Sequence, residues 1–207
     1  MADAGRKLLA SELEGLLVEF NKQLEISNKV VRLAVCGGVV MVLSGSRERT
    51  SDIDGLFKSG GEDLANEIHD TAVKFELDDG WLNTEVNDIF SLLNVPESEF
   101  EPFRKYSNLE VIRVSDKIML SMKVCAARER ADRPDLPGKN DLPDTVTLLR
   151  RMKLLTFNEV MKVLNEVREI TMRNTRIGKV YTVEYDARNI EFLKKALKQA
   201  KKSADKI

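Results

Sequence analysis

Apolar residues recur along the chain with two different periods, which separate predicted helices from predicted strands. Near the N-terminus they return every three or four residues with charges between them, as in an amphipathic helix. The apolar side of this helix consists of Leu9, Leu13, Leu16, Phe20 and Leu24. Residues 29–36 are mostly apolar and include three β-branched valines, which predicts a buried strand. Residues 39–45 predict a short helix, 51–57 a second strand and 62–77 another amphipathic helix.

The pattern is less regular in the middle of the chain. Residues 81–90 fit either a short strand or a helix, and Pro96 and Pro102 indicate a loop after them. Residues 108–114 alternate in part between apolar and polar side chains, which predicts a third strand.

Beyond the third strand the pattern is almost entirely helical. A helix is predicted over 116–131, with Ser115-Asp116 at its N-cap. It is followed by a loop over 132–143, which holds three of the chain's five prolines. The remaining segments are helices over 144–153 and 156–173, an extended stretch over 179–185, and a lysine-rich terminal helix.

These segments together predict an α/β (α+β) fold with two parts. Residues 1–114 form a small mixed sheet flanked by helices, and residues 115–207 form a mainly helical region that contributes to the same cleft. The content of 43% hydrophobic and 32% charged residues is typical of a globular protein. A net charge of −1 argues against a general nucleic-acid binder, although it permits a locally basic cleft.

The sequence also limits the setting and the chemistry. It contains no segment long and apolar enough to span a bilayer and no signal-peptide pattern, so we expect a cytoplasmic protein with no membrane partner. Cys36 and Cys125 lie among apolar neighbours and are expected to be reduced, buried thiols. His69 is the single histidine and lies on a predicted helix surface, which disfavours hydrolases with a histidine base.

A glycine pair and an acidic pair supply the candidate chemistry. Gly37-Gly38 follow the first strand, where glycines let the backbone approach a ligand and direct N–H groups at an anion. Asp52 and Asp54 flank Ile53 on the second strand, so their side chains are expected on one face. Two adjacent carboxylates without histidine or thiolate suit Mg²⁺ or Mn²⁺, and Mg²⁺ is commonly shared with substrate phosphates. The combination predicts a site for a nucleoside triphosphate (NTP) and its metal.

Each of these two features has a simpler interpretation when taken alone. A D-x-D sequence also occurs in solvated turns, and a Gly-Gly pair in any loop. Their order places both at one end of the sheet and favours the site. The P-loop pattern is absent, and the third glycine of a dinucleotide-binding fingerprint is absent as well.

Residues 36–54 resemble the signature of the polymerase-β-type nucleotidyltransferase superfamily, in which an apolar strand, Gly-Gly or Gly-Ser and a short helix precede D-x-D. The segment is most similar to the bacterial branch that holds abortive-infection (AbiEii-like) nucleotidyltransferase toxins and related uncharacterised proteins. That branch carries R-x-T-x-D-I-D. Here Arg49 and Thr50 precede the acidic pair with a slight departure in register, and Arg47 is the alternative arginine.

The same branch carries a second motif, a helix with K-x-x-A and an arginine, followed by D-x-x-D. This sequence matches it with Lys123, Ala126, Arg128, Arg130, Asp141 and Asp144. The spacing of Lys123, Ala127 and Arg130 places them in one stripe of a helix, beside apolar positions. A lysine at the border of a buried face is placed to reach triphosphate oxygens. A solvated helix flank is the simpler interpretation of this stripe.

The resemblance implies a nucleotidyltransferase core in residues 1–114 and the transfer of a nucleoside monophosphate from an NTP to an acceptor hydroxyl. The expected metal ligands and catalytic residues are Asp52 and Asp54. The superfamily has a third carboxylate on a later strand, for which Glu110 is the prediction and Glu85 and Asp88 are the other candidates. The residues expected to bind the nucleotide are Gly37, Gly38, Ser44 or Ser46, Arg49, Thr50, Lys123, Arg130 and Asp141.

The acceptor is left open. By analogy with the toxins it is RNA, such as tRNA, and the partner is a cognate antitoxin or toxin protein. One alternative is a catalytically degenerate nucleotide-binding or antitoxin-like module. Another is a small-molecule nucleotidyltransferase of the aminoglycoside-modifying type, for which the segment FELDDGW (residues 75–81) is the local candidate for an acidic pocket. The lysine-rich terminal helix either holds RNA or is a solvated surface that keeps the chain soluble.

Overall fold

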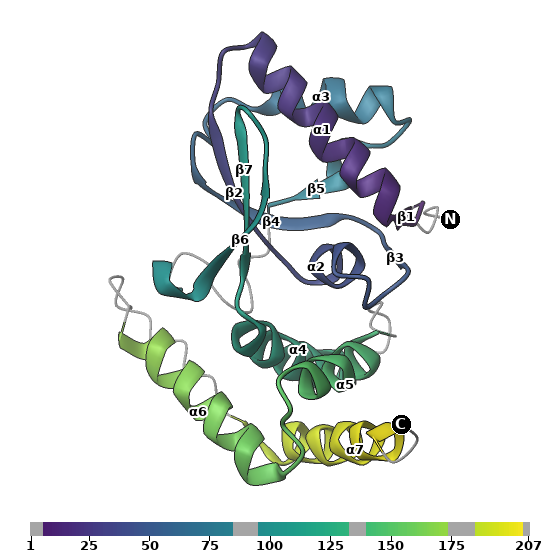
Figure 1. Cartoon of the computed structure of the whole chain (residues 1–207), viewed down its shortest axis with the longest axis vertical. Coiled ribbons are helices and arrows are strands. Elements are labelled where there is room, and N and C mark those ends of the chain that lie inside the picture. The colour runs from purple at the N-terminus through teal and green to yellow at the C-terminus, as the bar shows by residue number, and fades with distance from the viewer. Residues whose placement is uncertain (1–5, 85–94, 133–139, 174–184, 205–207) are drawn as a thin grey trace. The chain divides into compact units, whose positions relative to one another are not determined.

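The computed structural model describes residues 6–84, 95–132, 140–173 and 185–204 (Figure 1). The chain divides into two compact units. Unit 1 comprises Met1–Asp88 and Phe100–Val114, and unit 2 comprises Ile89–Glu99 and Ser115–Ile207. The described helices, the five-stranded mixed sheet and a small two-stranded sheet confirm the predicted α/β class.

Unit 1 holds both sheets of the described chain, and most of its elements agree with the predicted ones. The helices are α1 (Ala10–Ile26), α2 (Gly38–Leu43), α3 (Ala65–Lys74) and the single 3₁₀ turn η1 (Asp79–Trp81). The strands are β1 (Leu8–Leu9), β2 (Val31–Cys36), β3 (Arg49–Thr50), β4 (Ile53–Ser59), β5 (Leu82–Asn83), β6 (Phe100–Lys105) and β7 (Leu109–Val114).

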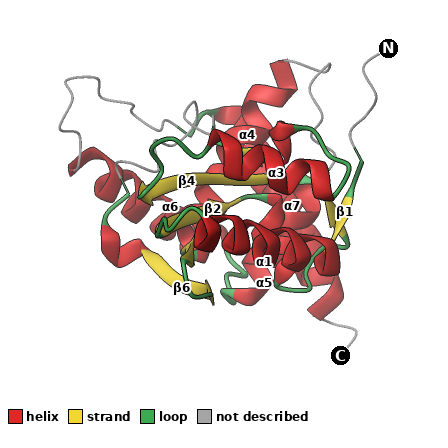
Figure 2. Cartoon of the chain, turned by 90° about the horizontal axis from the view of Figure 1, so that it is seen from above, coloured by secondary structure: helices red, strands yellow, loops and turns green. Residues whose placement is uncertain are grey.

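The larger sheet has the strand order β5-β4-β2-β7-β6. The central strand β2 is antiparallel to β4 and parallel to β7. At the edges, β5 runs parallel to β4 and β6 runs antiparallel to β7. Figure 2 shows the yellow strands β2 and β4 with red helices α1 and α3 alongside them. The C-terminal end of β2 and the start of β4 therefore meet at one end of this sheet.

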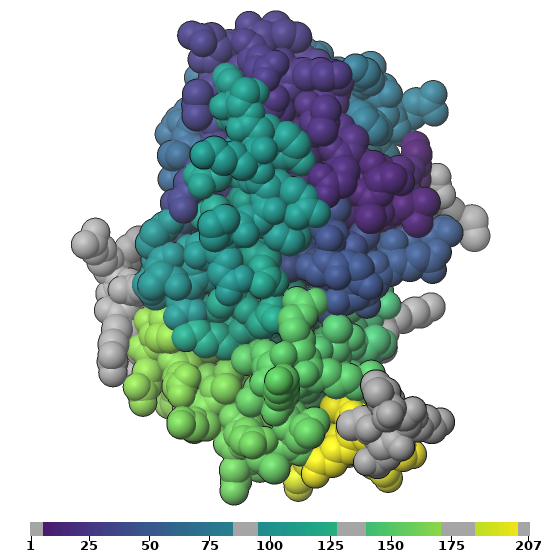
Figure 3. Space-filling model, viewed as in Figure 1, coloured from purple at the N-terminus to yellow at the C-terminus, as the bar shows by residue number. Residues whose placement is uncertain are grey.

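The core of unit 1 forms where α1 packs on the sheet. Four of the five predicted apolar positions of α1 are fully buried, namely Leu13, Leu16, Phe20 and Leu24. The Phe20 ring meets the Trp81 ring edge to face at 5.8 Å, which ties α1 to the η1 turn. Glu14 accepts hydrogen bonds from Arg104 Nε at 2.7 Å and Tyr106 Oη at 3.1 Å. Consequently α1 (purple) and β6–β7 (teal) lie side by side in Figure 3.

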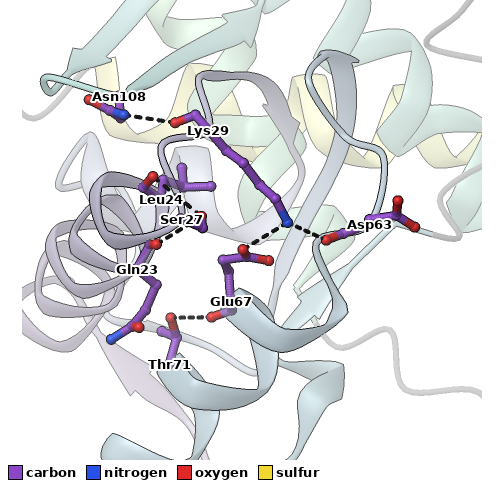
Figure 4. Close-up of polar contacts among 8 residues, drawn as sticks. All are labelled: Gln23, Leu24, Ser27, Lys29, Asp63, Glu67, Thr71 and Asn108. Carbon is purple, nitrogen blue, oxygen red and sulfur yellow. Dashed lines mark hydrogen bonds and ion pairs between the residues drawn. The ribbon is translucent and has the colours of Figure 1, made fainter.

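An ion pair between half-buried Lys29 and buried Glu67 lies near the C-terminal end of α1 (Figure 4). Lys29 Nζ lies 2.8 Å from Glu67 Oε1 and donates to the Asp63 carbonyl at 2.5 Å. Burial raises the pKa of Glu67, but hydrogen bonds from Lys29 and Ser27 outweigh it and lower the pKa overall. This pair links the segment before β2 to the first turn of α3, and we regard it as structural.

Three predicted boundaries in unit 1 were wrong. Leu9 does not face the core: it is 37% exposed and belongs to β1, which pairs with β3. Asp52 precedes β4, which begins at Ile53, so the acidic pair straddles the strand start. Pro102, predicted in a loop, lies in β6 beside a register shift. An edge strand tolerates proline because one of its sides needs no N–H donor.

Unit 2 is helical over its described residues. Its elements are the 3₁₀ turn η3 (Glu97–Glu99), α4 (Asp116–Asp132), α5 (Asp141–Arg151), α6 (Phe157–Arg173) and α7 (Ala187–Ala204). The predicted loop over 132–143 ends earlier than expected, because α5 includes Pro143 in its first turn. Proline is tolerated there because first-turn N–H groups have no intrahelical partner. Most of the predicted extended stretch over 179–185 lies outside the described residues.

Candidate functional site

The site in unit 1 is built around the bend that ends β2. Gly37 has φ +69° and ψ −137°, a backbone conformation that residues other than glycine rarely adopt. A Cβ atom at Gly37 would lie 2.7 Å from Asp54 Oδ2. The glycine is therefore required twice, by its backbone conformation and by the close approach of the carboxylate.

The second glycine is packed equally closely. A Cβ atom at Gly38 would overlap Thr50 Oγ1 and would lie 3.1 Å from Arg47 Nη1. Thr50 is 3% exposed, so its hydroxyl lies at a buried border of the bend. Gly38 is also the first residue of α2, where N–H groups have no carbonyl partner within the helix. The predicted residues Gly37, Gly38 and Thr50 are thus brought together with Asp54 and Arg47.

Asp54 is held between two strands. In the sheet register it lies opposite Cys36 on one side and opposite Asn83 on the other. Asn83 Nδ2 donates to Asp54 Oδ1 at 3.0 Å, while Oδ2 faces Gly37. Alternation along β4 turns the neighbouring Ile53 into the core, where it is fully buried. The two oxygens of Asp54 therefore have fixed and different surroundings.

Asp52 is electrostatically coupled to Asp54. Burial and the negative charge of Asp54 raise the pKa of Asp52 to about 6, and the Arg47 guanidinium opposes the increase. The acidic pair is therefore close in space, as the sequence predicted, although Asp52 is not on the strand. The raised pKa means that the Asp52 carboxyl takes up a proton more readily than an ordinary aspartate.

The donor set fits Mg²⁺ or Mn²⁺. It consists of carboxylate oxygens from Asp52 and Asp54, beside the glycine bend. Hard divalent ions prefer such oxygens, and Mg²⁺ is commonly bound by one or two carboxylates together with substrate phosphates. In the described part of the chain, no group of three or more histidine, cysteine, aspartate or glutamate side chains is arranged to hold a metal. The candidate site therefore rests on two carboxylates.

The arginine of the site is Arg47 and not Arg49. Arg49 and Thr50 are neighbours on β3, so their side chains point to opposite faces. Thr50 points to the bend, and Arg49 contacts Glu48 at 3.2 Å in an exposed pair. Arg47 instead lies beside Gly38 and acts on Asp52. The structure therefore brings Arg47, the alternative arginine, to the bend, and a nucleotide-binding role of Arg49 stays a prediction.

The two serines lie at the other end of the short helix. The N–H groups of Ser46 and Arg47 donate to the Met41 carbonyl at 2.8 and 3.2 Å, which closes the C-terminal end of α2. Ser46 is half-buried and Ser44 is exposed. The backbone N–H of Ser46 thus serves the helix end, and a role of its hydroxyl in binding phosphate stays a prediction.

The structure places Glu110, the residue predicted as the third carboxylate, away from the acidic pair. It lies opposite Arg32 in the register of β2 and β7 and pairs with Arg32 Nε at 3.0 Å. Asp54 lies opposite Cys36, four residues further along β2, about 13 Å at 3.3 Å per residue. Since β2 and β7 are parallel, the start of β7 is far from the end of β2. Glu110 therefore belongs to a surface ion pair.

Sequence reasoning missed Asn83, which occupies a neighbouring position to Asp54. The segment around it was left open between strand and helix, and the acids considered there, Glu85 and Asp88, lie outside the described residues. Had residues 82–83 been identified as a strand parallel to β4, Asn83 would have been placed beside the acidic pair. Its amide, unlike a carboxylate, donates a hydrogen bond to Asp54.

The second motif forms a cluster of its own in unit 2. Lys123 Nζ on α4 lies 2.7 Å from Asp144 Oδ2 and 3.4 Å from Asp141 Oδ1, both on α5. The side chains of Asp141 and Asp144 are 5% and 3% exposed, so this is a buried ion-pair network. Arg128 and Arg130 lie in α4, and their side chains are outside the described part. A nucleotide-binding role of Lys123, Arg130 and Asp141 stays a prediction.

The acidic residues proposed for a small-molecule acceptor have local partners. Asp78 accepts a hydrogen bond from the Gly80 N–H at 2.9 Å and begins the η1 turn. Asp79 lies 3.1 Å from His69 Nδ1 in an exposed pair. Both side chains are therefore explained by the turn and by α3, which leaves the small-molecule alternative without support from these residues.

Comparison with known proteins leaves the family of this chain open. No family model matches the sequence, no curated protein matches it significantly, and no solved structure does so either. Among the described helices, none has the length and apolar character needed to cross a bilayer. Cys36 and Cys125 are free thiols; Cys36 is buried and Cys125 is half-buried.

Proposed function

We propose that this chain is a metal-dependent nucleotidyltransferase that moves a nucleoside monophosphate from an NTP to a hydroxyl of an RNA acceptor. The observation that carries the proposal is the position of Asp54, whose carboxylate lies against the Gly37 bend with Asp52 coupled to it. A remote or divergent acidic pair would have removed the basis for it. A cognate antitoxin is the corresponding protein partner.

In this proposal the acceptor oxygen forms a bond to the α-phosphorus while the bond from that phosphorus to the bridging oxygen breaks. Pyrophosphate leaves, and the acceptor proton passes to water. Asp52 and Asp54 would hold Mg²⁺, which would supply charge neutralisation for the triphosphate when bound. Gly37 and Gly38 let the Asp54 carboxylate, the Thr50 hydroxyl and the Arg47 guanidinium approach the backbone of the bend, and Arg47 adds a positive charge for the phosphates. Asn83 holds the orientation of Asp54.

A second candidate function is a nucleotide-binding module without turnover. It is favoured by Asn83, because an amide stands beside Asp54 where a third carboxylate would complete the acidic set. It is favoured also by the position of Glu110 at the far end of β2. Such a module would bind Mg²⁺-NTP through the acidic pair and would transfer nothing.

The test incubates the full chain with each α-³²P-labelled NTP, Mg²⁺ and total RNA, and follows label in the RNA. We expect transfer with the wild type and a loss of at least 100-fold in Asp52→Asn and in Asp54→Asn, since each removes one metal ligand. Arg49→Gln is the matched control, because Arg49 is charged, close in sequence and outside the bend.

Calorimetry with Mg²⁺-ATP and Mg²⁺-CTP separates the two candidates. Transfer that depends on both aspartates supports the enzyme. Binding that depends on them, with no label in RNA for any NTP, supports the non-catalytic module. Transfer that persists in Asp52→Asn and Asp54→Asn contradicts both, because the acidic pair is common to them.

A further inference from the structure

The helix α7 carries a strong local charge in a nearly neutral chain. It holds six basic residues and one acidic residue, a net charge of +5, whereas the whole chain has a net charge of −1. Five of the basic residues are lysines in its last three turns, and all are exposed: Lys194, Lys195, Lys198, Lys201 and Lys202. Positive charge is therefore concentrated on this helix.

These lysines have no carboxylate partner in an ion pair among the residues that the structure describes. Glu159 has its pKa lowered mainly by hydrogen bonds from Thr156 and Leu155, and the charge of Lys201 contributes the least. Lys194, Lys198 and Lys202 follow each other at four-residue intervals, where like charges repel and reduce helix stability. A solvated helix face commonly carries acidic and basic side chains in alternation, whereas this face carries basic ones. A polyanion is therefore the partner with complementary charge.

The opposite side of α7 decides between two kinds of polyanion. Its apolar residues Leu193, Ala196, Leu197 and Ala200 are already buried within unit 2. The helix is fixed there by Arg150, which donates to the carbonyls of Gln199 and Ala200 at 3.0 and 3.3 Å. A basic helix that binds a membrane must insert its apolar face into the lipid. Since this face is occupied, α7 is suited to the phosphate backbone of a nucleic acid.

We propose that the lysine face of α7, defined as Lys194, Lys195, Lys198, Lys201 and Lys202, binds the phosphate backbone of the RNA acceptor. In naming RNA as the acceptor the inference rests on the proposed function. The stripe Lys194–Lys198–Lys202 extends over about 12 Å at 1.5 Å per residue. Contacts of lysine with phosphate position the strand without reading its sequence.

The test measures the dissociation constant of the full chain for a tRNA-sized RNA over a range of salt concentrations, without NTP. The variant Lys194→Gln/Lys198→Gln/Lys202→Gln removes one stripe and keeps good helix formers. We expect the variant to bind RNA more weakly. The slope of the logarithm of the binding constant against the logarithm of the salt concentration should decrease in magnitude by about 2–3, because each lost phosphate contact removes about 0.7–0.9 from it. The control Lys7→Gln/Lys105→Gln/Lys162→Gln removes the same charge from exposed positions elsewhere and should bind like the wild type.

Circular dichroism of both variants verifies that the helices are retained. Equal RNA affinity and salt slope in the two triple variants would overturn the inference, as would binding to phosphatidylserine vesicles without binding to RNA. The same measurement in Asp52→Asn/Asp54→Asn keeps the proposed function separate. If this variant binds RNA like the wild type, and the wild type itself transfers label to RNA from none of the NTPs, the proposed enzyme fails and the RNA-binding face stands.

Discussion

At the scale of single residues, close approach explains more of the candidate site than charge does. Asp54 Oδ2 reaches the backbone bend after β2 because Gly37 has no side chain. Asp54 Oδ1 accepts a hydrogen bond from the Asn83 amide. Arg47 and Thr50 approach Gly38 for the same reason. A substitution that adds one carbon atom at the bend therefore tests the geometry more directly than a change of charge.

Gly37→Ala should reduce Mg²⁺-NTP binding by more than tenfold, because its Cβ displaces the Asp54 carboxylate. Gly45→Ala is the matched control, since Gly45 has φ +70° but no atom within 4 Å of its Cβ position. Both substitutions strain a positive-φ residue and should destabilise the fold by about 1–3 kcal/mol. Calorimetry and thermal unfolding give the two quantities. Equal loss of binding in both variants would show that Asp54 is not displaced.

Asn83→Ala should lower turnover by about 10- to 100-fold, because it removes a hydrogen bond that orients the Asp54 carboxylate. The free energy of unfolding should change by at most about 1.5 kcal/mol, since a single hydrogen bond is lost. Asn158→Ala, at an exposed position on α6, is the control. The pair is compared by label transfer and by Mg²⁺ titration of binding. Unchanged Mg²⁺ affinity in Asn83→Ala would mean that Asp54 keeps its orientation without the amide.

At the scale of elements, parallel and antiparallel pairing decides which side chains meet. Because β4 is antiparallel to β2, its first residues lie at the end of β2, beside Gly37. Because β7 is parallel to β2, Glu110 at its start lies opposite Arg32, away from the bend. In unit 2 the pairing of α4 with α5 is fixed by Lys123, which binds two carboxylates of the first turn of α5.

Lys123→Met should destabilise unit 2 by about 3–5 kcal/mol, since it removes a cation that pairs with the buried carboxylates of Asp141 and Asp144. Arg188→Met is the control, because it removes the ion pair of Arg188 with Asp186, in which the arginine side chain is 51% exposed. It should lower the free energy of unfolding by at most about 1 kcal/mol. Hydrogen exchange of α4 and α5 measures the loss within unit 2. A loss no greater than that of Arg188→Met would indicate that Lys123 is not a structural cation.

At the scale of the whole molecule, the ionised form of Asp52 lowers the stability of the folded chain. Asp52 is less stable as an anion in the folded chain than in the unfolded chain, because burial and Asp54 raise its pKa from 3.8 to about 6. Its contribution to stability is therefore most favourable below pH 4, decreases as the pH rises to 6, and stays unfavourable above. Proteins commonly retain such a penalty where charge is needed for function.

Asp52→Asn should be more stable than the wild type at pH 7.5, by up to about 3 kcal/mol for a shift of about two pKa units. The difference should disappear below pH 4, where the wild-type carboxyl is protonated in both the folded and the unfolded state. Adding Mg²⁺ at pH 7.5 should raise the melting temperature of the wild type and not that of the variant. Thermal unfolding between pH 3.5 and 8 measures all three effects. A constant difference across that range would contradict the raised pKa.

Local patterns determined most of the secondary structure. The apolar spacing of α1, the β-branched run of β2 and the glycine pair were sufficient to predict a helix, a strand and a bend, because each depends on neighbouring residues. The D-x-D pair was likewise visible, since two acids with one apolar residue between them share a side of any extended segment. Pro102 misled the prediction because tolerance of proline depends on whether a strand lies at an edge.

The sequence alone therefore determined the α/β class, the bend and the acidic pair. The tertiary structure decided that Arg47 rather than Arg49 faces the bend, that Asn83 contacts Asp54, and that Glu110 does not. It also decided that Lys123 is paired with two buried aspartates. The reason is physical: strand order, direction and register result from the packing of distant segments, and a strand's position in the sheet is not encoded in its own residues.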